Sequence, residues 1–348
     1  LPERLGVRMV GAHQQARPGL VEIKVVSVGQ QRGELGPGWP GADFRNGKVT
    51  VVDSSTHNDF TEYSWSPDSR FIVYTKNNDA GYGSLWIYSV AAGNSRQVTS
   101  DMTDDGEGVF DPQGRYLYFT SSRDQDLEFS SIEFNYLVTD SIRVYAAQLN
   151  ADQPALFRPQ SDEVSVGEEN GDGKDEESES EVTVRIDFEG IQDRVVALQD
   201  SGGVFRALSA TAGGPLYLSG QGPDTALHLF DLEAEEEKVI LKGVNAYALA
   251  SGGEKVLFGT NGKWGIASVA PDQDASKGLI DLDDMEVRVD PATEWRQMYT
   301  DGWRILRDWF YDPAMHGQDW QAIHDRYLPL VDHVAHRAET GAGARIAD

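Results

Sequence analysis

The chain has 348 residues, a length typical of about two domains that each bury a core. Its formal net charge of −27 argues against nucleic acid as a partner, because the phosphates would be repelled. The absence of cysteine excludes disulfides, thiolate catalysis and cysteine-ligated zinc. No apolar run approaches the roughly 18 residues that a membrane span needs, and no signal peptide is visible. We therefore expect no nucleic-acid or membrane partner, and a cytoplasmic location.

The first stretch, residues 1–46, differs in composition from the rest of the chain and stays unassigned. It is slightly basic, rich in Gly, Gln and Arg, and has no clear hydrophobic period. The chain also begins at Leu1 and not at Met, so we expect the natural N-terminus to be missing.

A repeat of about 45 residues begins near residue 47. Its two clearest copies are SWSPDSRFIVYT (64–75) and GVFDPQGRYLYFTS (108–121). In both, an aromatic residue is followed by Ser-Pro or Asp-Pro, a turn and an alternating strand. Pro presets φ in such a turn, and Gly or Asp tolerates the other positions. Trp65 aligns with Phe110, and Tyr74 aligns with Phe119 in the same way.

Weaker copies and companion strands extend this repeat to residue 289. GGPLYLSG (213–220) and YALASGGEKVLFG (247–259) are degenerate copies. A second strand comes after each copy and a polar turn: SLWIYSV (84–90), SIRVYAAQL (141–149), ALHLFDL (226–232) and WGIASV (264–269).

Four short strands in each repeat are typical of a β-propeller blade. The sequence therefore predicts a mainly β fold, with a propeller over 47–289. We count four to five four-stranded blades of an expected seven, and we expect the missing blades to lie on the N-terminal side. A flat β-sandwich is the alternative fold.

An acidic, low-complexity run at 160–181 interrupts the propeller. It has almost no apolar residues, so burial cannot offset the entropy of ordering it, and we expect a disordered surface insert. VTVRIDFEGI (182–191) is predicted to resume the sheet.

Residues 290–339 have helical period and predict a small α-helical domain. Asp290 followed by Pro is a helix start, and Asp312 followed by Pro is a stop. A second helix fits from Asp319, and the tail at 340–348 is divergent. The expected inward residues are Trp295, Met298, Trp303, Leu306 and Phe310, then Trp320, Ile323, Tyr327 and Val331.

Two acidic stretches partly resemble calcium-binding loops. Glu168, Asn170, Asp172, Gly173 and Glu179 have near-correct spacing, but the run starts with Glu and no helices flank it. A solvated acidic surface is favoured over a calcium site. A second set has Pro112 where the closing Glu should stand and is interpreted as a loop: Asp101, Thr103, Asp105 and Gly106.

Histidines and serines give no catalytic constellation. His333 and His336 could share a helix face, but no HExxH motif accompanies them, so solvated surface histidines are favoured over zinc ligands. His316 lies in a turn, where bonding to backbone is favoured over catalysis. Neither Ser209 nor Ser219 has a His or acid at suggestive spacing, and no GxSxG, P-loop or GxGxxG motif is present.

We therefore predict no catalytic, cofactor-binding or metal residue in this chain, and no cofactor. Trp65, Trp86 and Trp264 alternate along strands and are interpreted as blade core. A platform that stacks ligands is the alternative for these tryptophans.

Two segments together resemble the tricorn protease family in its bacterial form. One is the propeller part, with YSWSPDSRFIVYT, FDPQGRYLYFTSSRD, FSSIEFNYLVTDSIRVYAAQL and VRIDFEGIQDRVVAL. The other is the helical EWRQMYTDGWRILRDWFYDPAMHGQDWQAIHDRYLPLVDHVAHRAE. The resemblance covers about 47–339, and FEGIQDR (188–194) and the WFYDP…DW pattern (309–320) are its most specific parts.

The resemblance implies a large serine peptidase that degrades oligopeptides. In that family two propellers precede a helical domain, a PDZ-like domain and a catalytic α/β domain, and the propeller gates or channels peptides. This chain would be part of the second propeller and the first helical domain, and the intact protein a homo-oligomer. After Glu339 it departs from the family pattern before the expected catalytic histidine. No residue here inherits a catalytic role, so we expect this polypeptide alone to be inactive.

Two other functions stay open. A stand-alone propeller could bind peptide or protein without catalysis. The propeller of a prolyl-oligopeptidase-type enzyme has similar repeats, but it would be accompanied by an α/β-hydrolase domain with GxSxG, whereas this chain enters a tryptophan-rich helical unit.

Overall fold

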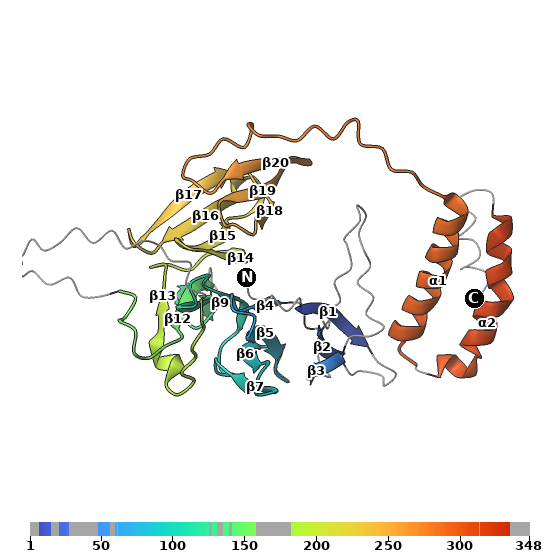
Figure 1. Cartoon of the computed structure of the whole chain (residues 1–348), viewed down its shortest axis with the longest axis horizontal. Helices are drawn as coiled ribbons and strands as arrows, with labels where there is room; N and C mark the ends of the chain where they lie inside the picture. Colours follow the sequence, from blue (N-terminus) through green and yellow to red (C-terminus); the bar gives the residue numbers. More distant parts are fainter. Residues whose placement is uncertain are drawn as a thin grey trace, which may run out of the picture. The chain divides into compact units, whose positions relative to one another are not determined.

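Figure 1 shows the chain as a computed structural model. The structure describes residues 7–14, 21–27, 48–55, 60, 62–124, 127–130, 135–138, 141–157, 182–312 and 314–334. Two compact units divide the chain, one mostly within Val21–Ile280 and the other mostly within Asp281–Asp348.

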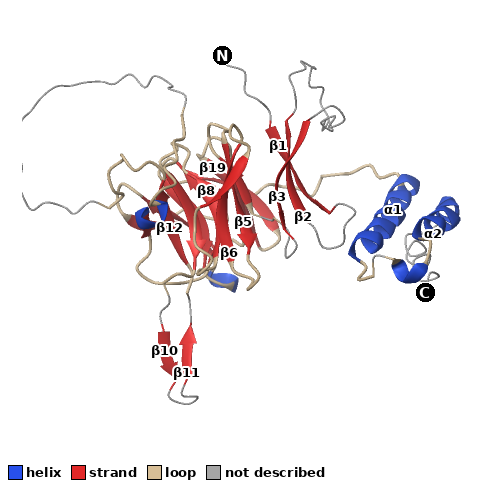
Figure 2. Ribbon diagram, turned by 90° about the horizontal axis from the view of Figure 1, so that it is seen from below, coloured by secondary structure: helices blue, strands red, loops and turns tan. Residues whose placement is uncertain are grey.

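The first unit consists of antiparallel sheets. Three of those described have four strands. They are β4 (Tyr63–Trp65), β5 (Phe71–Asn77), β6 (Gly83–Ser89) and β7 (Asn94–Gln97); then β8 (Asp105–Phe110), β9 (Tyr116–Ser121), β12 (Arg143–Gln148) and β13 (Val195–Ala197); then β14 (Phe205–Thr211), β15 (Gly214–Ser219), β16 (Ala226–Asp231) and β17 (Glu236–Lys242). In each, strands adjacent in this order pair with one another, and Figure 2 shows the sheets in red.

Smaller sheets complete the described part of this unit. Two have three strands: β1 (Val7–Gln14), β2 (Val21–Ser27) and β3 (Lys48–Ser55); then β18 (Ala246–Leu249), β19 (Lys255–Thr260) and β20 (Lys263–Ser268). Leu279 forms a further bridge to Gly265 on β20. β10 (Leu127–Ser130) and β11 (Asn135–Val138) pair as a separate hairpin. β1 and β2 thus lie within residues 1–46, for which the sequence predicts no structure.

Successive side chains of a strand point to opposite faces of its sheet. Here the two faces enter different cores, so successive sheets stack face to face. On β5, Ile72 and Tyr74 enter one core, whereas Val73 enters the core on the opposite face. Leu117 and Phe119 of β9 share that second core with Val73. A third core joins the β8/β9/β12/β13 sheet to the β14–β17 sheet, and a fourth joins the latter to the β18–β20 sheet. This stacking of short four-stranded sheets is the predicted blade architecture.

The repeat turn is the same in three sheets. The backbone N–H of Ser66 donates to the carbonyl of Phe71 at 2.9 Å, and Asp111 donates to Tyr116 at 2.9 Å. The equivalent bond in the weaker copy joins Ala250 to the carbonyl of Lys255 at 2.8 Å. The fourth turn residue is left-handed in every case, with φ 59° at Ser69, 72° at Gly114 and 73° at Gly253. The sequence alignment of these copies is therefore confirmed.

One predicted strand is wrong. Residues 182–188 form no ladder, and the outer strand of the sheet is β13 at Val195–Ala197. The 182–188 segment is held in two other ways: Val184 packs in the core, and the Asp187 N–H donates to the Leu149 carbonyl at 2.9 Å. The 3₁₀ turn Ile191–Arg194 separates this segment from β13. The acidic insert at 160–181 lies outside the described residues.

The second unit contains the predicted helices. α1 (Pro291–Trp309) begins where expected, because the Asp290 carboxylate accepts the Ala292 N–H at 3.2 Å. α2 (Trp320–Tyr327) is capped by Asp319, whose carboxylate accepts the Ala322 N–H at 2.9 Å. The second unit also contains the 3₁₀ helices Met315–Gly317 and Leu328–His333. In the first unit, Gly222–Asp224 is a 3₁₀ helix like Ile191–Arg194.

The inward faces of these helices are partly as predicted. Val331 is buried, and Trp303 and Trp320 are half-buried, but Met298 and Leu306 of α1 are exposed. No helix in the described ranges is both long and apolar enough to cross a membrane.

Candidate functional site

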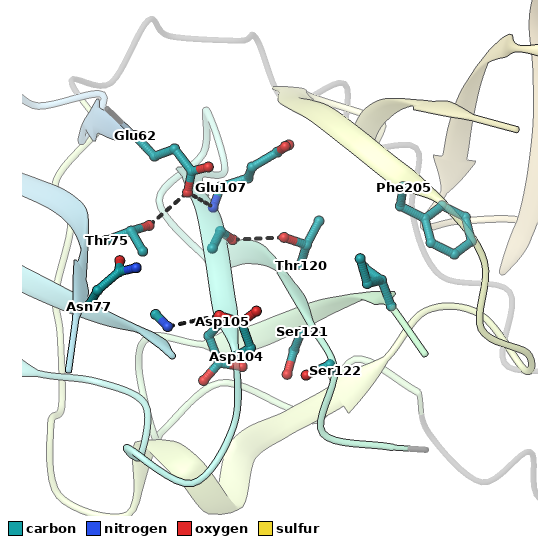
Figure 3. A pocket seen from close by; sticks show the side chains of 13 residues that line it. Glu62, Thr75, Asn77, Asp104, Asp105, Glu107, Thr120, Ser121, Ser122 and Phe205 are labelled. Carbon is teal, nitrogen blue, oxygen red and sulfur yellow. Dashed lines mark hydrogen bonds between the residues drawn. The ribbon is translucent and has the colours of Figure 1, made fainter. Parts of the chain in front are cut away.

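A pocket of about 470 Å³ opens where strands of three neighbouring sheets meet (Figure 3). Four carboxylates contribute to its lining: Glu62, Asp104, Asp105 and Glu107. Hydroxyl and amide groups from β5 and β9 add further polar surface. Ile142 and Phe205 form an apolar part of the wall, and Figure 3 shows Phe205 across the pocket from Glu62. The site is thus acidic on one side and apolar on the other.

Glu107 enters the pocket from a β-bulge. The pairing of β8 with β9 shifts register between Gly106 and Val109, and Glu107 has φ 52°, a left-handed value that is uncommon for this residue type. β14 has the equivalent shift between Arg206 and Ser209, and Ala207 has φ 56°. A bulge of this kind redirects side chains, which brings the Glu107 carboxylate to the pocket.

Carboxylates tie each bulge to the preceding sheet. Glu62 Oε2 accepts the backbone N–H of Glu107 at 2.8 Å and the hydroxyl of Thr75 at 2.9 Å. Glu107 Oε2 in turn accepts the backbone N–H of Leu208 at 2.7 Å. A glutamate therefore holds the bulge of the next sheet in two successive sheets. These bonds connect β5, β8 and β14 around the pocket.

Asp104 and Asp105 line the base of the site. Asp104 Oδ1 accepts the Gly83 N–H at 2.8 Å and so links β6 to the next sheet. A Cβ at position 83 would lie 2.6 Å from the Asp105 carbonyl oxygen, so only glycine fits this approach. The Asp105 carboxylate is buried and pairs with Arg123 at 3.2 Å, and that guanidinium also lies 4.9 Å from the Phe119 ring centre.

The acidic side of the pocket is short of positive charge. Burial raises the pKa of Glu107, and repulsion from Glu62 adds to this rise. Hydrogen bonds from the N–H groups of Leu208 and Ala207, together with attraction from Arg206, oppose it. Within the described ranges, Asp105 is ion-paired, but Glu62, Asp104 and Glu107 accept from N–H and O–H groups and form no ion pair. Arg206 attracts Glu107, so a cationic group entering the pocket would find Glu62 and Asp104 as the carboxylates without a cationic partner among the described residues.

Of the residues considered as candidate sites from the sequence, Asp105 and Gly106 line this pocket. These two belong to β8 and line the pocket, so the loop interpretation of their stretch is wrong at this point. The calcium-like run of Glu168, Asn170, Asp172, Gly173 and Glu179 is outside the described residues, as is His336. Among the residues that the structure describes, no cluster of three or more His, Cys, Asp or Glu could hold a metal ion.

Other singled-out residues have structural surroundings. His333 is exposed, and the backbone N–H of His316 donates to Asp312 at 3.0 Å, while its ring contacts the Tyr311 hydroxyl. Ser209 lies on β14, beside the Tyr247 hydroxyl, which donates to the Ala207 and Leu216 carbonyls. Trp65 and Trp86 pack against buried residues of β5 and β6, as predicted for blade core. Trp264 does not, because its side chain is 40% exposed on β20.

Sequence reasoning missed Glu62 and Glu107, although a signal for them exists. Each stands three residues before the aromatic residue of its repeat, Trp65 or Phe110, so the two carboxylates are 45 residues apart. Extending the repeat alignment by three residues would have placed both on the same edge of neighbouring sheets.

Comparison with known proteins identifies the family. The Tricorn protease second beta propeller domain matches residues 24–269, and the Tricorn protease C1 domain matches residues 291–341. The chain belongs to the tricorn protease family. The two matches thus cover the sheet strands from β3 onward, the pocket and the helices, in the order predicted from sequence.

Individual tricorn relatives are longer than this chain. Tricorn protease homolog 1 of Streptomyces coelicolor is 27% identical over 314 residues, covering 83% of this chain and 29% of the homolog. Tricorn protease of Thermoplasma volcanium is 25% identical over 305 residues, covering 85% and 29%. A crystal structure of the tricorn protease superposes with a TM-score of 0.70 at 17% identity, over 99% of this chain and 33% of that chain, which supports the fold.

Proposed function

We propose that this chain is the non-catalytic propeller and helical part of a tricorn-like serine peptidase that degrades oligopeptides. The observation that carries the proposal is the succession of the second propeller domain and the C1 domain in one chain. The chain spans 29% of the length of Streptomyces coelicolor homolog 1, which leaves room in such a protein for a catalytic domain. The propeller would gate or channel peptides, with the pocket around Glu62 and Glu107 on their route.

The proposed chemistry is serine acyl transfer, with the general base and oxyanion hole supplied by other domains. Within the described residues, none of the serines or histidines singled out from the sequence forms a nucleophile–base pair. The role of this chain is then to bind and orient peptides, not to cleave them.

A stand-alone binding propeller is the second candidate. It is favoured by the pocket itself, which is built by residues of three sheets of this chain and needs no other domain to form. The first candidate binds peptide and the second binds peptide or protein, and they differ in whether a catalytic domain shares the gene.

Two measurements test the proposal. The purified chain is incubated with a fluorogenic oligopeptide library, and we expect peptide binding without hydrolysis. Hydrolysis that survives repurification would contradict a non-catalytic role. Sequencing the gene downstream of codon 348 then separates the candidates: a PDZ-like segment and a serine-bearing α/β domain support the peptidase, and a stop codon supports the binding module.

A further inference from the structure

We propose that the pocket between Glu62 and Phe205 binds the ammonium group of a peptide together with an apolar side chain next to it. This inference rests on the proposed function, because it specifies which peptides the propeller would admit. It combines three observations: the cavity, the unbalanced charge on one wall and the apolar surface on the other.

The cavity has the dimensions of a ligand site. Its volume of about 470 Å³ falls within the roughly 300–1,000 Å³ of small-molecule pockets. It can therefore take the first one or two residues of a peptide, with the remaining chain directed to solvent.

The acidic wall selects a positive charge. Glu62 and Glu107 each use Oε2 to hold backbone N–H groups, and Asp104 uses Oδ1 in the same way. The Glu107 carboxylate also accepts the Ala207 N–H, whereas Glu62 Oε1 and Asp104 Oδ2 accept no hydrogen bond from the described residues. An ammonium group has three N–H donors and can bridge such oxygens, and each charge-assisted bond is stronger than a neutral one.

Repulsion between the carboxylates favours the same ligand. Repulsion from Glu62 adds to the raised pKa of Glu107 and is larger than the attraction from Arg206, so the two negative charges destabilise each other. A cation between them offsets this repulsion, whereas an anion or a neutral amide does not.

The apolar wall is held in place by contacts with the surrounding sheets. It determines which ligand side chain can lie next to the ammonium group. Phe205 packs edge-to-face on Tyr217, with ring centres 5.5 Å apart, and is 9% exposed. Ile142 is 36% exposed, and its carbonyl accepts the Gly203 N–H at 2.9 Å, which ties it to the segment before Phe205. The ligand is thus expected to place an aliphatic or aromatic side chain against this surface, close to its charged nitrogen.

Two sources of the ammonium fit this chemistry, the peptide N-terminus and a lysine side chain. Isothermal titration of the complete 348-residue chain can separate them with three hexapeptide amides. The first begins with a free-amine leucine, the second is the same peptide N-acetylated, and the third is acetylated but carries one lysine beside leucine.

We expect the free-amine peptide, the lysine peptide or both to bind at least about tenfold more tightly than the neutral peptide, because one charge-assisted bond is worth that much. The peptide that binds more tightly identifies the source. The preference should also weaken as salt is raised.

Charge-removing variants tie the preference to this pocket. Asp104→Asn and Glu62→Gln keep an oxygen for the backbone bonds but lose the charge, and both should bring the affinity ratio toward one. Glu254→Gln is the matched control, because Glu254 is exposed in the turn before β19. Circular dichroism checks that each variant is folded, and if one variant unfolds the other still tests the pocket.

The remaining outcomes are decisive. Equal binding of all three peptides, or a preference that both pocket variants retain, overturns this inference and leaves peptide binding by the propeller intact. Absence of binding by every peptide overturns the inference and also contradicts the proposed peptide route.

Discussion

The sheets and the helices of this protein are stabilised in different ways. In the first unit, side chains such as Val73, Leu117 and Phe258 are fully buried, because neighbouring sheets cover both faces of a strand. In the described part of the second unit, Val331 is the one buried hydrophobic residue. Ile305 of α1 is 59% exposed and Leu330 is 54% exposed.

This difference shows that stacking gives the sheets their core, whereas the helices rely on a few specific contacts. Trp303 Nε1 donates to the Trp320 carbonyl at 2.9 Å, and Trp320 Nε1 donates to the Trp303 carbonyl at 3.1 Å. Arg296 of α1 pairs with Asp332 of the 3₁₀ helix Leu328–His333. Such polar contacts give less free energy than a close-packed core.

The largest expected effect comes from removing a buried side chain from the sheets. Leu117→Ala deletes a side chain with no exposed surface in the core between two sheets, and it should lower the free energy of unfolding by about 3 kcal/mol or more. Hydrogen exchange followed by mass spectrometry measures this loss separately in each unit. Protection should fall in the peptides of β5, β9 and β12.

Ile305→Ala is the matched test on α1. Because this side chain is exposed, its removal should change stability by no more than about 0.5 kcal/mol. A loss as large as that of Leu117→Ala would break the comparison, since it would mean that the helix surface is covered in solution.

Several features of the sheets and of α1 could be predicted from sequence. Ser-Pro and Asp-Pro turns determine local backbone geometry, so the repeat turns after Trp65 and Phe110 were predicted, and Asp290 gave the start of α1 by the same local logic. The bulge at Glu107 was not predicted, because its left-handed φ is stabilised by Glu62, 45 residues earlier. Trp264 was assigned to the core because strand alternation cannot show whether another sheet covers a face.

The second expected effect concerns the helices. Trp303→Phe keeps an aromatic ring against His324, whose ring centre lies 4.7 Å away, but removes the bond to the Trp320 carbonyl. We expect a loss of about 1 kcal/mol, measured as reduced exchange protection in α1 and α2. Trp264→Phe removes an exposed indole and should cost less than half as much. If the two variants are equally destabilised, the tryptophan pair does not hold the helices together.

The smallest effects compare two carboxylates of the sheets by their pH dependence. Burial alone would raise the pKa of Glu237, but hydrogen bonds with His228 and Tyr217 outweigh it and lower the pKa below 4.5. The stabilisation by Glu237 is therefore present above pH 4.5 and is lost as the pH falls through its folded pKa. Glu107 has a pKa above 4.5, so its contribution is present below that pH and is lost as the pH rises.

Unfolding free energies measured across this range should show the two opposite signs. Glu237→Gln should lose its disadvantage relative to the unmodified chain as the pH falls, because the native carboxylate then becomes protonated. Glu107→Gln should improve relative to the unmodified chain as the pH rises above 4.5, since the amide avoids the buried charge beside Glu62. Parallel pH profiles for the two variants would show that the pocket carboxylates are as well compensated as those between the sheets, and would remove the electrostatic reason for a cationic ligand.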